Sequence, residues 1–261
     1  MSRLEYKYLF HINDIDKLRR RMSFFIIPDW YGNHERGEYV VRSIYYDTPS
    51  LEYYFRKEAG FIIRKKIRLR GYDEYDPGKT VFFEIKRKLN NRIYKERIPV
   101  KFSNVSKFLM TGEIDRDVKL SGILNIEKYV DHFLFHYHSK SLVPVILVTY
   151  DREAYYSKFN RCLRITFDKN LRAKLFPTVD ELFMDSGMEY VIRNYFILEV
   201  KFYNSLPDYL LNVIGEFSVP RLALSKYVMS VDGLQRKGRL SFLPKLIVNR
   251  SRIARNFESG G

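Results

Sequence analysis

The sequence predicts an α+β fold built on an eight-stranded antiparallel β-barrel with flanking helices. The chain of 261 residues contains 21 Tyr and 20 Phe, residue types that favour strands. Strand-like runs recur along its length, and in several of them charged residues occupy alternate positions. A closed barrel accommodates both features, because it gives alternate side chains an inside and an outside and removes exposed edges.

Eight segments have the alternation or the apolar content that is typical of strands. They are residues 3–11, 38–47, 60–72, 80–89, 91–100, 143–154, 161–168 and 194–203. Turn-forming residues separate neighbouring strands, as at Asp76-Pro77-Gly78 and Asn90-Asn91.

Five further segments are predicted to be helical. Asn13 is the expected N-cap of the first helix, and Pro207 opens a later one. The predicted helices cover residues 13–21, 103–109, 120–138, 208–217 and 221–234.

The chain is predicted to form one tunnel-like domain over residues 1–235, because no internal repeat or low-complexity linker divides it. Residues 236–261 form a distinct basic tail with seven Lys or Arg and one Glu. The spacing of its apolar residues is irregular, which favours packing on the domain or mild disorder over contact with a partner or a membrane surface.

Composition points to an anionic partner and to the cytoplasm. The formal net charge is +15 and the pI is about 9.7, which suits nucleic acid, an acidic membrane surface or phosphorylated small molecules. Cys162 is the only cysteine, so the chain has no internal disulfide and fits a reducing compartment. No apolar run approaches the length of a transmembrane helix, and the N-terminus has no signal-peptide pattern.

Charged residues on alternate strand positions predict a basic surface inside the barrel. In the run from 64 to 70, side chains of one parity lie on one face of the strand, and they are Arg64, Lys66, Arg68 and Arg70. The next two strands add Lys86 and Lys88, then Lys95 and Arg97. Like charges side by side across a sheet repel one another, so this surface needs a strongly anionic ligand, and a chain of phosphates is the natural candidate.

Three carboxylates share a strand face with a lysine two residues away. They are Glu5 with Lys7, Glu84 with Lys86, and Glu199 with Lys201. One such pair alone would be an ordinary surface ion pair. Three of them beside the basic surface predict oxygen ligands for a divalent metal, Mg²⁺ or Mn²⁺, in a phosphate-binding cavity.

The C-terminal half adds further candidates for this cavity. Tyr150-Asp151-Arg152 closes one strand, and Arg164 shares a strand face with Thr166 and Asp168. Ser225-Lys226-Tyr227 lies in the last predicted helix, from which Lys226 can reach one end of the barrel.

From Glu5 to about Asp232 the chain resembles the VTC domain, the catalytic module of the vacuolar transporter chaperone polyphosphate polymerases, in the triphosphate tunnel metalloenzyme (CYTH-like) superfamily. The resemblance rests on motifs that occur in order along the chain. They are Glu5-Tyr6-Lys7-Tyr8, Ser43-Ile44-Tyr45-Tyr46-Asp47, Tyr54-Phe55-Arg56, Arg68-Leu69-Arg70-Gly71-Tyr72, Phe83-Glu84-Ile85-Lys86, Lys95-Glu96-Arg97, Tyr150-Asp151-Arg152, Leu163-Arg164-Ile165, Leu198-Glu199-Val200-Lys201 and Ser225-Lys226-Tyr227.

The resemblance implies a tunnel in which the γ-phosphoryl group of ATP is transferred onto phosphate or a polyphosphate end. The bases that it places in the tunnel are Lys7, Arg68, Arg70, Lys86, Lys95, Arg152, Arg164 and Lys226. It places the metal on Glu199, with Glu84 and Glu5 as the further carboxylate candidates, and Tyr150 where an aromatic ring stacks on the nucleotide base. Arg56, Lys201 and Ser225 stand in the same motifs and are expected to contact the ligand.

The chain departs from the family pattern at two positions. The superfamily's N-terminal Glu-x-Glu-x-Lys occurs here with Arg3 in place of the first Glu, which favours the polymerase branch over a two-metal hydrolase. A second lysine that the polymerases often carry before the late Ser-Lys is replaced by Ala223, which weakens the expected grip on phosphate at that end.

Four functions remain open at this point. A polyphosphate polymerase is favoured over a non-catalytic module that binds polyphosphate or nucleotide, and that module over a tunnel triphosphatase. A nucleic-acid binder is not expected, because its basic residues should spread over an exterior face with stacking aromatics. The sequence has no predicted membrane helices, so transport of the product across a membrane would need a membrane-protein partner. The protein would then be recruited to the inner face of that membrane.

The histidines of the helix predicted at residues 120–138 do not indicate a metal site. His132 and His136 are four residues apart on a predicted helix but lack a third metal ligand, so solvated side chains are expected.

Overall fold

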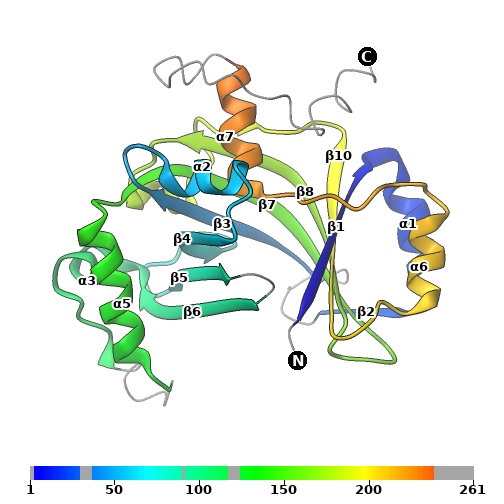
Figure 1. The fold of residues 1–261 in the computed structure, drawn as a ribbon, viewed down its shortest axis with the longest axis horizontal. Helices are drawn as coiled ribbons and strands as arrows, with labels where there is room; N and C mark the ends of the chain where they lie inside the picture. The colour runs from blue at the N-terminus through cyan, green and yellow to red at the C-terminus, as the bar shows by residue number, and fades with distance from the viewer. Residues whose placement is uncertain (1–2, 30–36, 90–91, 117–123, 238–261) are drawn as a thin grey trace.

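The computed structural model describes residues 3–29, 37–89, 92–116 and 124–237. Its framework is one antiparallel sheet with the strand order β1-β10-β8-β7-β3-β4-β5-β6, to which β2 and β9 add at β7 and β8 (Figure 1). The strands are β1 Leu4–His11, β2 Ile26–Pro28, β3 Glu38–Asp47, β4 Ile63–Tyr72, β5 Thr80–Leu89, β6 Arg92–Lys101, β7 Val143–Ser157, β8 Arg164–Leu175, β9 Glu189–Tyr190 and β10 Tyr195–Phe202.

Each of the eight predicted strands is present, and the short strands β2 and β9 were not predicted. The helices are α1 Ile15–Met22, α2 Glu52–Glu58, α3 Val105–Thr111, α5 Ile126–Ser139, α6 Asp208–Gly215 and α7 Lys226–Arg236, with 3₁₀ turns η1 Ile12–Asp14, η2 Phe102–Asn104 and η3 Val179–Phe183. The start of the predicted helix at 120–123 and the tail from 238 onward lie outside the described residues. No described helix has the length and apolar character that crossing a bilayer requires.

The predicted closed barrel is not confirmed. Strands β1 and β6 are the two ends of the sheet, and no pairing joins them in the part of the chain that the structure describes. One physical reason is that the segment before α7 occupies the outer edge of β1. There Leu222 N donates to Lys7 O at 2.9 Å, and Arg221 forms a bridge with Tyr8, so these edge groups already have partners.

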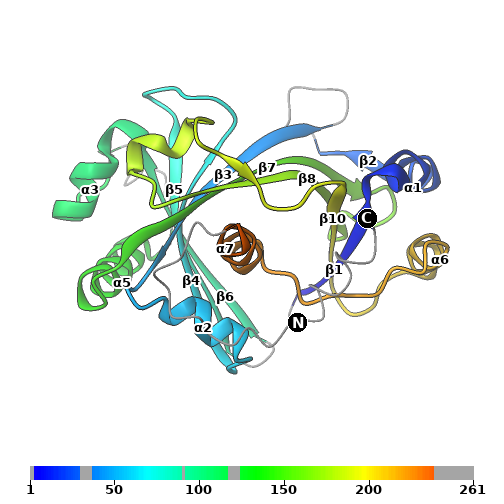
Figure 2. The ribbon, with the colours of Figure 1, turned by 90° about the horizontal axis from the view of Figure 1, so that it is seen from above.

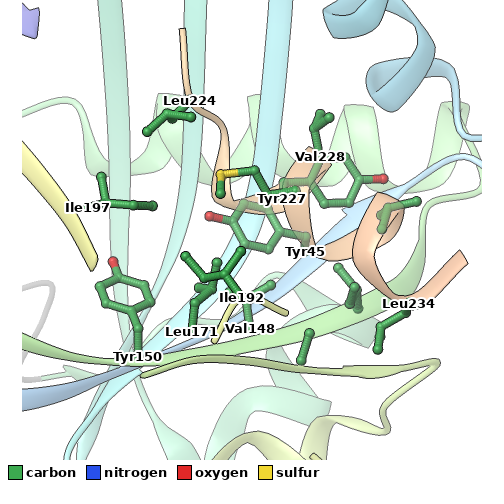
Figure 3. Packing of buried hydrophobic residues seen from close by; sticks show 14 of the residues in the cluster. Tyr45, Val148, Tyr150, Leu171, Ile192, Ile197, Leu224, Tyr227, Val228 and Leu234 are labelled. Carbon is green, nitrogen blue, oxygen red and sulfur yellow. The ribbon is translucent and has the colours of Figure 1, made fainter. Parts of the chain in front are cut away.

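The sheet curls nonetheless, and its two arms face each other across the concave side. Figure 2 shows β1 and β10 on one side, β4 and β6 on the other, and α7 between them. Apolar clusters pack α1 and α6 against the convex face of β1, β10 and β8, and α3 and α5 against that of β4 and β5. Helix α7 instead packs on the concave face, where the rings of Tyr45 and Tyr227 stack with centroids 5.1 Å apart (Figure 3).

Two predicted details of the helices differ from the structure. Asn13 does not cap α1, because it lies inside the turn η1 and Asp14 precedes the helix. Helix α2 was not predicted, since its first turn is satisfied from outside. Asp47 accepts hydrogen bonds from Tyr53 N and Tyr54 N, both at 2.9 Å, and Thr48 Oγ1 accepts one from Glu52 N at 3.0 Å.

Candidate functional site

The register of the sheet places the predicted basic residues side by side on the concave face. Lys86 lies between Lys66 and Lys95 on the neighbouring strands, so three lysines form one row across β4, β5 and β6. In the next row Glu84 lies between Arg68 and Arg97. The alternation of charge in the sequence therefore becomes a continuous basic wall on one arm of the sheet.

The opposite arm carries matching rows. Lys201 of β10 lies between Glu5 of β1 and Arg164 of β8, and Glu199 lies between Lys7 and Thr166. Arg152 of β7 is paired with Asp168 of β8. These side chains face the basic wall across the concave side.

Two connected cavities lie between the arms, and we call them together the basic passage. The first has a volume of about 700 Å³ and is lined by nine Lys or Arg and two carboxylates, Glu5 and Asp29. The second, of about 300 Å³, is lined by seven Lys or Arg and by Glu5 alone among acids. Both include Glu5 and Lys86, whose side chains are 3.6 Å apart, so the cavities meet at this ion pair.

The predicted site residues divide among these cavities. Those that line the first are Arg68, Arg70, Lys95, Arg152, Arg164 and Lys201, and those that line the second are Lys7 and Ser225, with Lys86 and Glu5 in both. Glu84, Glu199, Tyr150 and Lys226 line neither cavity and lie behind the lining residues. Arg56 is outside the passage on α2, paired with Glu52 at 3.0 Å.

Glu84 is the counter-ion that orients the basic wall. It is 1% exposed and accepts hydrogen bonds from Arg68 Nε and Arg97 Nε, both at 2.7 Å, while Lys95 Nζ is 2.8 Å from its Oε1. Burial alone would raise the pKa of Glu84, but Arg68 and the other cations hold it well below its ordinary range. Glu84 therefore stays ionised and fixes the guanidinium groups toward the cavity.

Arg70 and Lys66 are cations without a carboxylate partner among the described residues. Arg70 is 7% exposed, and its guanidinium donates to Ser43 Oγ at 3.1 Å and to Tyr150 Oη at 3.4 Å. Lys66 Nζ donates to Ser225 Oγ at 2.8 Å. Burial, with Lys7 and Lys86 nearby, holds the pKa of Lys66 well below its ordinary value. Buried charge without a counter-ion is costly, so both groups are poised for an anionic ligand.

Glu5 and Glu199 are separated by lysine side chains. Lys7 Nζ is 2.8 Å from Glu5 Oε1 and 3.5 Å from Glu199 Oε2, and Lys201 Nζ is 2.5 Å from Glu199 Oε1. Burial and Glu199 favour the neutral form of Glu5, but Lys7 and neighbouring lysines lower its pKa to about 2. Burial lowers the pKa of Lys201 to about 8, despite the attraction of Glu199. Both carboxylates are thus available as anionic oxygen ligands once the ammonium groups move aside.

These carboxylates do not form a metal cage made of protein alone. No group of three His, Cys, Asp or Glu within the described ranges could hold a metal ion together. Mg²⁺ and Mn²⁺ often bind through one or two carboxylates plus phosphate oxygens and water, and Glu5 with Glu199 fits that arrangement. Glu84 fits it less well, because each of its oxygens accepts a hydrogen bond from an arginine at 2.7 Å, whereas Lys86 Nζ is 3.6 Å from Glu5 Oε2 and Lys7 Nζ is 3.5 Å from Glu199 Oε2.

Arg152, Asp168 and Lys226 form a buried ionic group where α7 meets the sheet. Arg152 Nε and Nη2 donate hydrogen bonds to the two carboxylate oxygens of Asp168, at 2.6 and 2.8 Å, and Lys226 forms an ion pair with the same carboxylate. Lys226 Nζ is also 3.9 Å from Glu199. Lys226 is the first residue of α7, so the start of the helix brings this lysine to Asp168 of β8 and Glu199 of β10.

Tyr150, which the resemblance assigns to the nucleotide base, is buried behind the lining of the passage. It is 2% exposed, and Lys226 Nζ and Arg152 Cζ lie 4.7 and 5.2 Å from its ring centroid. The register of β7 with β8 shifts between Thr149 and Asp151, which places Tyr150 at an irregularity of the sheet. The aromatic rings that line the first cavity are instead Tyr39, Tyr72, Tyr156 and Tyr203.

Sequence reasoning left several lining residues out of the site. Lys66 and Arg97 were placed on the basic strand faces by the alternation but were not among the residues assigned to the ligand, although the register sets them beside residues that were. Asp29 lies 2.7 Å from Arg164 Nη2 and comes from an irregular segment, where no spacing rule places it.

Of the three histidines on α5, His138 is exposed as expected, but His132 is only partly exposed and His136 is buried. His136 is 7% exposed and its Nε2 is 2.9 Å from His132 Nε2, while His132 Nδ1 is 2.5 Å from Glu96. Burial and the charge of Lys65 lower the pKa of His136 to about 4. This cluster is on the side of the sheet that faces α5, away from the basic passage.

Comparison with known proteins identifies a family. A family model described as the VTC domain matches residues 2–235. No curated protein matches the sequence closely enough to count as a relative.

Two solved structures are similar at low identity. One is the putative adenylyl cyclase HpAC1 from Hippeastrum, described as having a dominant triphosphatase activity, with 12% identity, 89% of this chain and 96% of that chain covered, and a TM-score of 0.49. The other is the Mimivirus capping enzyme triphosphatase, with 12% identity, 81% and 89% covered, and a TM-score of 0.31. Both scores are too low to carry an argument about fold or activity.

Proposed function

Because the chain belongs to the VTC domain family, we propose that it is a metal-dependent polyphosphate polymerase that transfers the γ-phosphoryl group of ATP onto phosphate or a polyphosphate end. The observation that carries the proposal is the basic passage, two cavities with a large excess of cations that meet at Glu5 and Lys86. A passage with many similar cations suits a product that must slide, because no single residue has to hold it.

The lining residues suit phosphoryl transfer. This reaction needs in-line positioning and neutralisation of charge on the transferring oxygens, and little covalent chemistry from the protein. Arg68, Arg70, Arg152 and Arg164 present planar guanidinium groups for bidentate contacts to phosphate, and Lys86 adds a compact charge at the junction of the cavities. Arg70 in particular gains a counter-ion only when an anion enters.

The metal is proposed to enter with the phosphates. Glu199 and Glu5 would hold Mn²⁺ or Mg²⁺, which neutralises charge on the phosphate oxygens when bound. Lys7 and Lys201, which now lie between and beside these carboxylates, would turn toward the phosphate chain. Glu84 keeps the role of positioning Arg68 and Arg97.

A binding module without catalysis is the second candidate, and one observation favours it. Glu199 is 5% exposed and covered by lysines, so a metal must displace ammonium groups to reach it. A triphosphatase is the third candidate and would use the same residues with water as the acceptor. In each case ATP, triphosphate or polyphosphate is the proposed ligand.

The test is incubation of the purified chain with ATP and Mn²⁺, followed by gel separation and polyphosphate staining. Glu199→Gln is the variant, and Glu181→Gln, at a carboxylate paired with Lys174 outside the passage, is its control. We expect a ladder of phosphate chains from the wild type and the control and none from Glu199→Gln. Release of orthophosphate without chain growth would instead support a triphosphatase, and tight tripolyphosphate binding without turnover would support a binding module.

Location in the cytoplasm and a membrane-protein partner remain part of this proposal. The single Cys162, exposed in the structure, is compatible with a reducing compartment. Fractionation of cells that express a tagged protein would locate it.

A further inference from the structure

An exposed apolar cluster lies at the end of the sheet arm formed by β4, β5 and β6. Phe61, Ile62 and Ile63 are 55%, 64% and 51% exposed, and Leu89, paired with Ile63 across β4 and β5, is 44% exposed. We call these four residues the apolar tip. Single exposed apolar residues are ordinary, but three in succession with a fourth paired to one of them form a contiguous patch that calls for a partner.

The apolar tip is held by an ordered turn. Helix α2 ends in Gly60 with φ of +72°, and Gly60 N donates to Lys57 O at 3.2 Å while Phe61 N donates to Arg56 O at 3.1 Å. This pattern is the Schellman motif, which fixes the direction of the chain after a helix. The guanidinium of Arg56 lies 5.9 Å from the Phe61 ring centroid. The apolar side chains are therefore presented outward from a defined backbone.

The surroundings of the apolar tip are strongly basic. Residues 56–66 contain five Lys or Arg and one Glu, and β5 adds Lys86, Arg87 and Lys88 just before Leu89. Figure 2 shows the end of α2 and the ends of β4 and β6 at the same edge of the molecule. Five of these cations line the second cavity, so the apolar tip lies beside that end of the basic passage; they are Lys57, Arg64, Lys66, Lys86 and Lys88.

We propose that the apolar tip and its basic rim dock the protein on the surface of an anionic lipid bilayer. Apolar side chains that enter the headgroup region, with Lys and Arg around them, are the combination that binds such surfaces. The inference does not depend on catalysis in the passage.

Two other occupants fit the patch less well. A second copy of the chain would bring two basic rims together, and like charges oppose such an interface. A protein partner is disfavoured by the lysines, because Lys is depleted in protein–protein interfaces. An anionic bilayer satisfies both the charge and the apolar side chains.

The experiment is co-sedimentation of the full chain with vesicles of phosphatidylcholine alone or with added phosphatidylserine. The variant Phe61→Ser/Ile62→Ser/Ile63→Ser removes the tip, and the matched control Met110→Ser/Phe135→Ser/Phe159→Ser removes three side chains that are 75%, 66% and 72% exposed elsewhere. We expect the wild type and the control to bind only the vesicles that contain phosphatidylserine. The tip variant should bind these vesicles at least about tenfold more weakly. A second variant, Arg56→Gln/Lys57→Gln, should weaken binding about fivefold for each charge removed.

Other outcomes overturn the proposal. Unchanged binding by the tip variant would assign the interaction to another basic segment, such as the tail after residue 237. Loss of binding in the presence of tripolyphosphate, with the tip variant unchanged, would place the lipid headgroup in the passage. Self-association that the tip variant abolishes, without vesicle binding, would make the patch a contact between copies. Retained tripolyphosphate binding by the tip variant checks that it is folded.

Discussion

At the scale of single residues, the passage holds two kinds of buried charge. Glu84 is surrounded by Arg68, Lys95 and Arg97, so its charge is compensated several times over. Arg70 is almost as buried but contacts only hydroxyl groups among the described residues. The first arrangement stabilises the fold, whereas Arg70 has no directly bonded carboxylate in the described part of the chain, only hydroxyl partners and the more distant charge of Glu84, and can still bind an anion.

Substitution of these two residues should therefore have opposite effects on stability. Arg70→Met should leave the free energy of unfolding unchanged or raise it, because it removes a buried charge without a carboxylate partner, and it should weaken tripolyphosphate binding at least tenfold. Glu84→Gln should lower the free energy of unfolding by about 3 kcal/mol, because three cations lose their counter-ion. Urea unfolding and calorimetric titration of both variants measure these effects. Destabilisation by Arg70→Met would show that Arg70 is structural.

The pKa of Lys201 makes ligand affinity depend on pH. In the folded protein this pKa is lowered from 10.5 to about 8 because of burial, so Lys201 loses its proton above pH 8, and an entering phosphate must restore it. The affinity for tripolyphosphate should then fall with rising pH, by up to about tenfold for each unit above 8. Lys201→Arg, which keeps its charge, should reduce that slope. Without ligand the sign is opposite, because the unfolded chain binds more protons between pH 8 and 10.5 and stability rises there. Calorimetric titration of both proteins between pH 7 and 10 tests this, and equal slopes would remove Lys201 from the explanation.

At the scale of elements, α7 closes the concave face and brings Lys226 to Asp168. It is docked on the end of β3 and on α2 through tyrosines: Tyr227 Oη donates to Asp47 of β3 at 2.7 Å, and Tyr54 Oη of α2 donates to Asp232 at 2.5 Å. Burial raises the pKa of Asp232 from 3.8 to about 6. The docking of α7 therefore includes a carboxylate that the fold prefers to keep protonated.

Asp232 should make stability decrease as pH rises from 4 to 6. Its folded pKa is above its unfolded value, so the folded state binds more protons in this window, and the contribution is present below pH 3.8 and lost through pH 6. Asp232→Asn, which can still accept from Tyr54, should raise the free energy of unfolding by about 1–2 kcal/mol at pH 7 and have little effect at pH 4. Urea unfolding at the two values measures the difference, with the exposed Asp180→Asn as control. A gain that is equal at both values would contradict the assignment.

The strands were predictable where period-two alternation extends over a long segment. The charges of β4, β5 and β6 gave both the strands and the face that each side chain occupies, and the register then assembled the rows around Lys86 and Glu84. Helix α2 was missed because its N-terminal hydrogen-bond acceptors are Asp47 and Thr48, residues that end a strand and a turn. The residue at the N-cap position is Leu51, which provides no capping side chain, so the usual sequence signal for the start of a helix is absent.

The burial of the individual side chains was the part of the site that could not be predicted from the sequence. Alternation placed Glu199 on the same strand face as Lys201, and the resemblance assigned Tyr150 to the nucleotide base, but α7 and the neighbouring lysines cover both side chains. The predicted closure of the barrel was not confirmed for a similar reason, because the segment at Leu222 is hydrogen-bonded to the outer edge of β1. Both outcomes depend on where a distant segment lies, which alternation along one strand does not contain.

At the scale of the whole molecule, the fold brings many cations close together between the two arms of the sheet. The chain carries a net charge of +15, and 14 of its 46 Lys and Arg line the two cavities between the arms of the sheet, with only Glu5 and Asp29 as carboxylates. Repulsion between like charges destabilises the folded state. It acts between neighbouring cations in rows such as Lys66, Lys86 and Lys95. A polyanion in the passage removes the repulsion, so ligand binding and folding stability are linked.

This linkage predicts how salt and ligand act together on the melting temperature. Without ligand, raising NaCl from about 50 to about 500 mM should raise the melting temperature, because it screens repulsion in the passage. Tripolyphosphate at about 100 times its dissociation constant should add about 2.7 kcal/mol at low salt, and the increment should shrink as salt rises. Scanning calorimetry with orthophosphate at matched ionic strength as the control measures both effects. A ligand-free protein that melts lower in high salt would mean that attractive ion pairs such as those of Glu84 and Asp168 outweigh the repulsion, and the passage would then be a balanced network rather than a site that requires a polyanion.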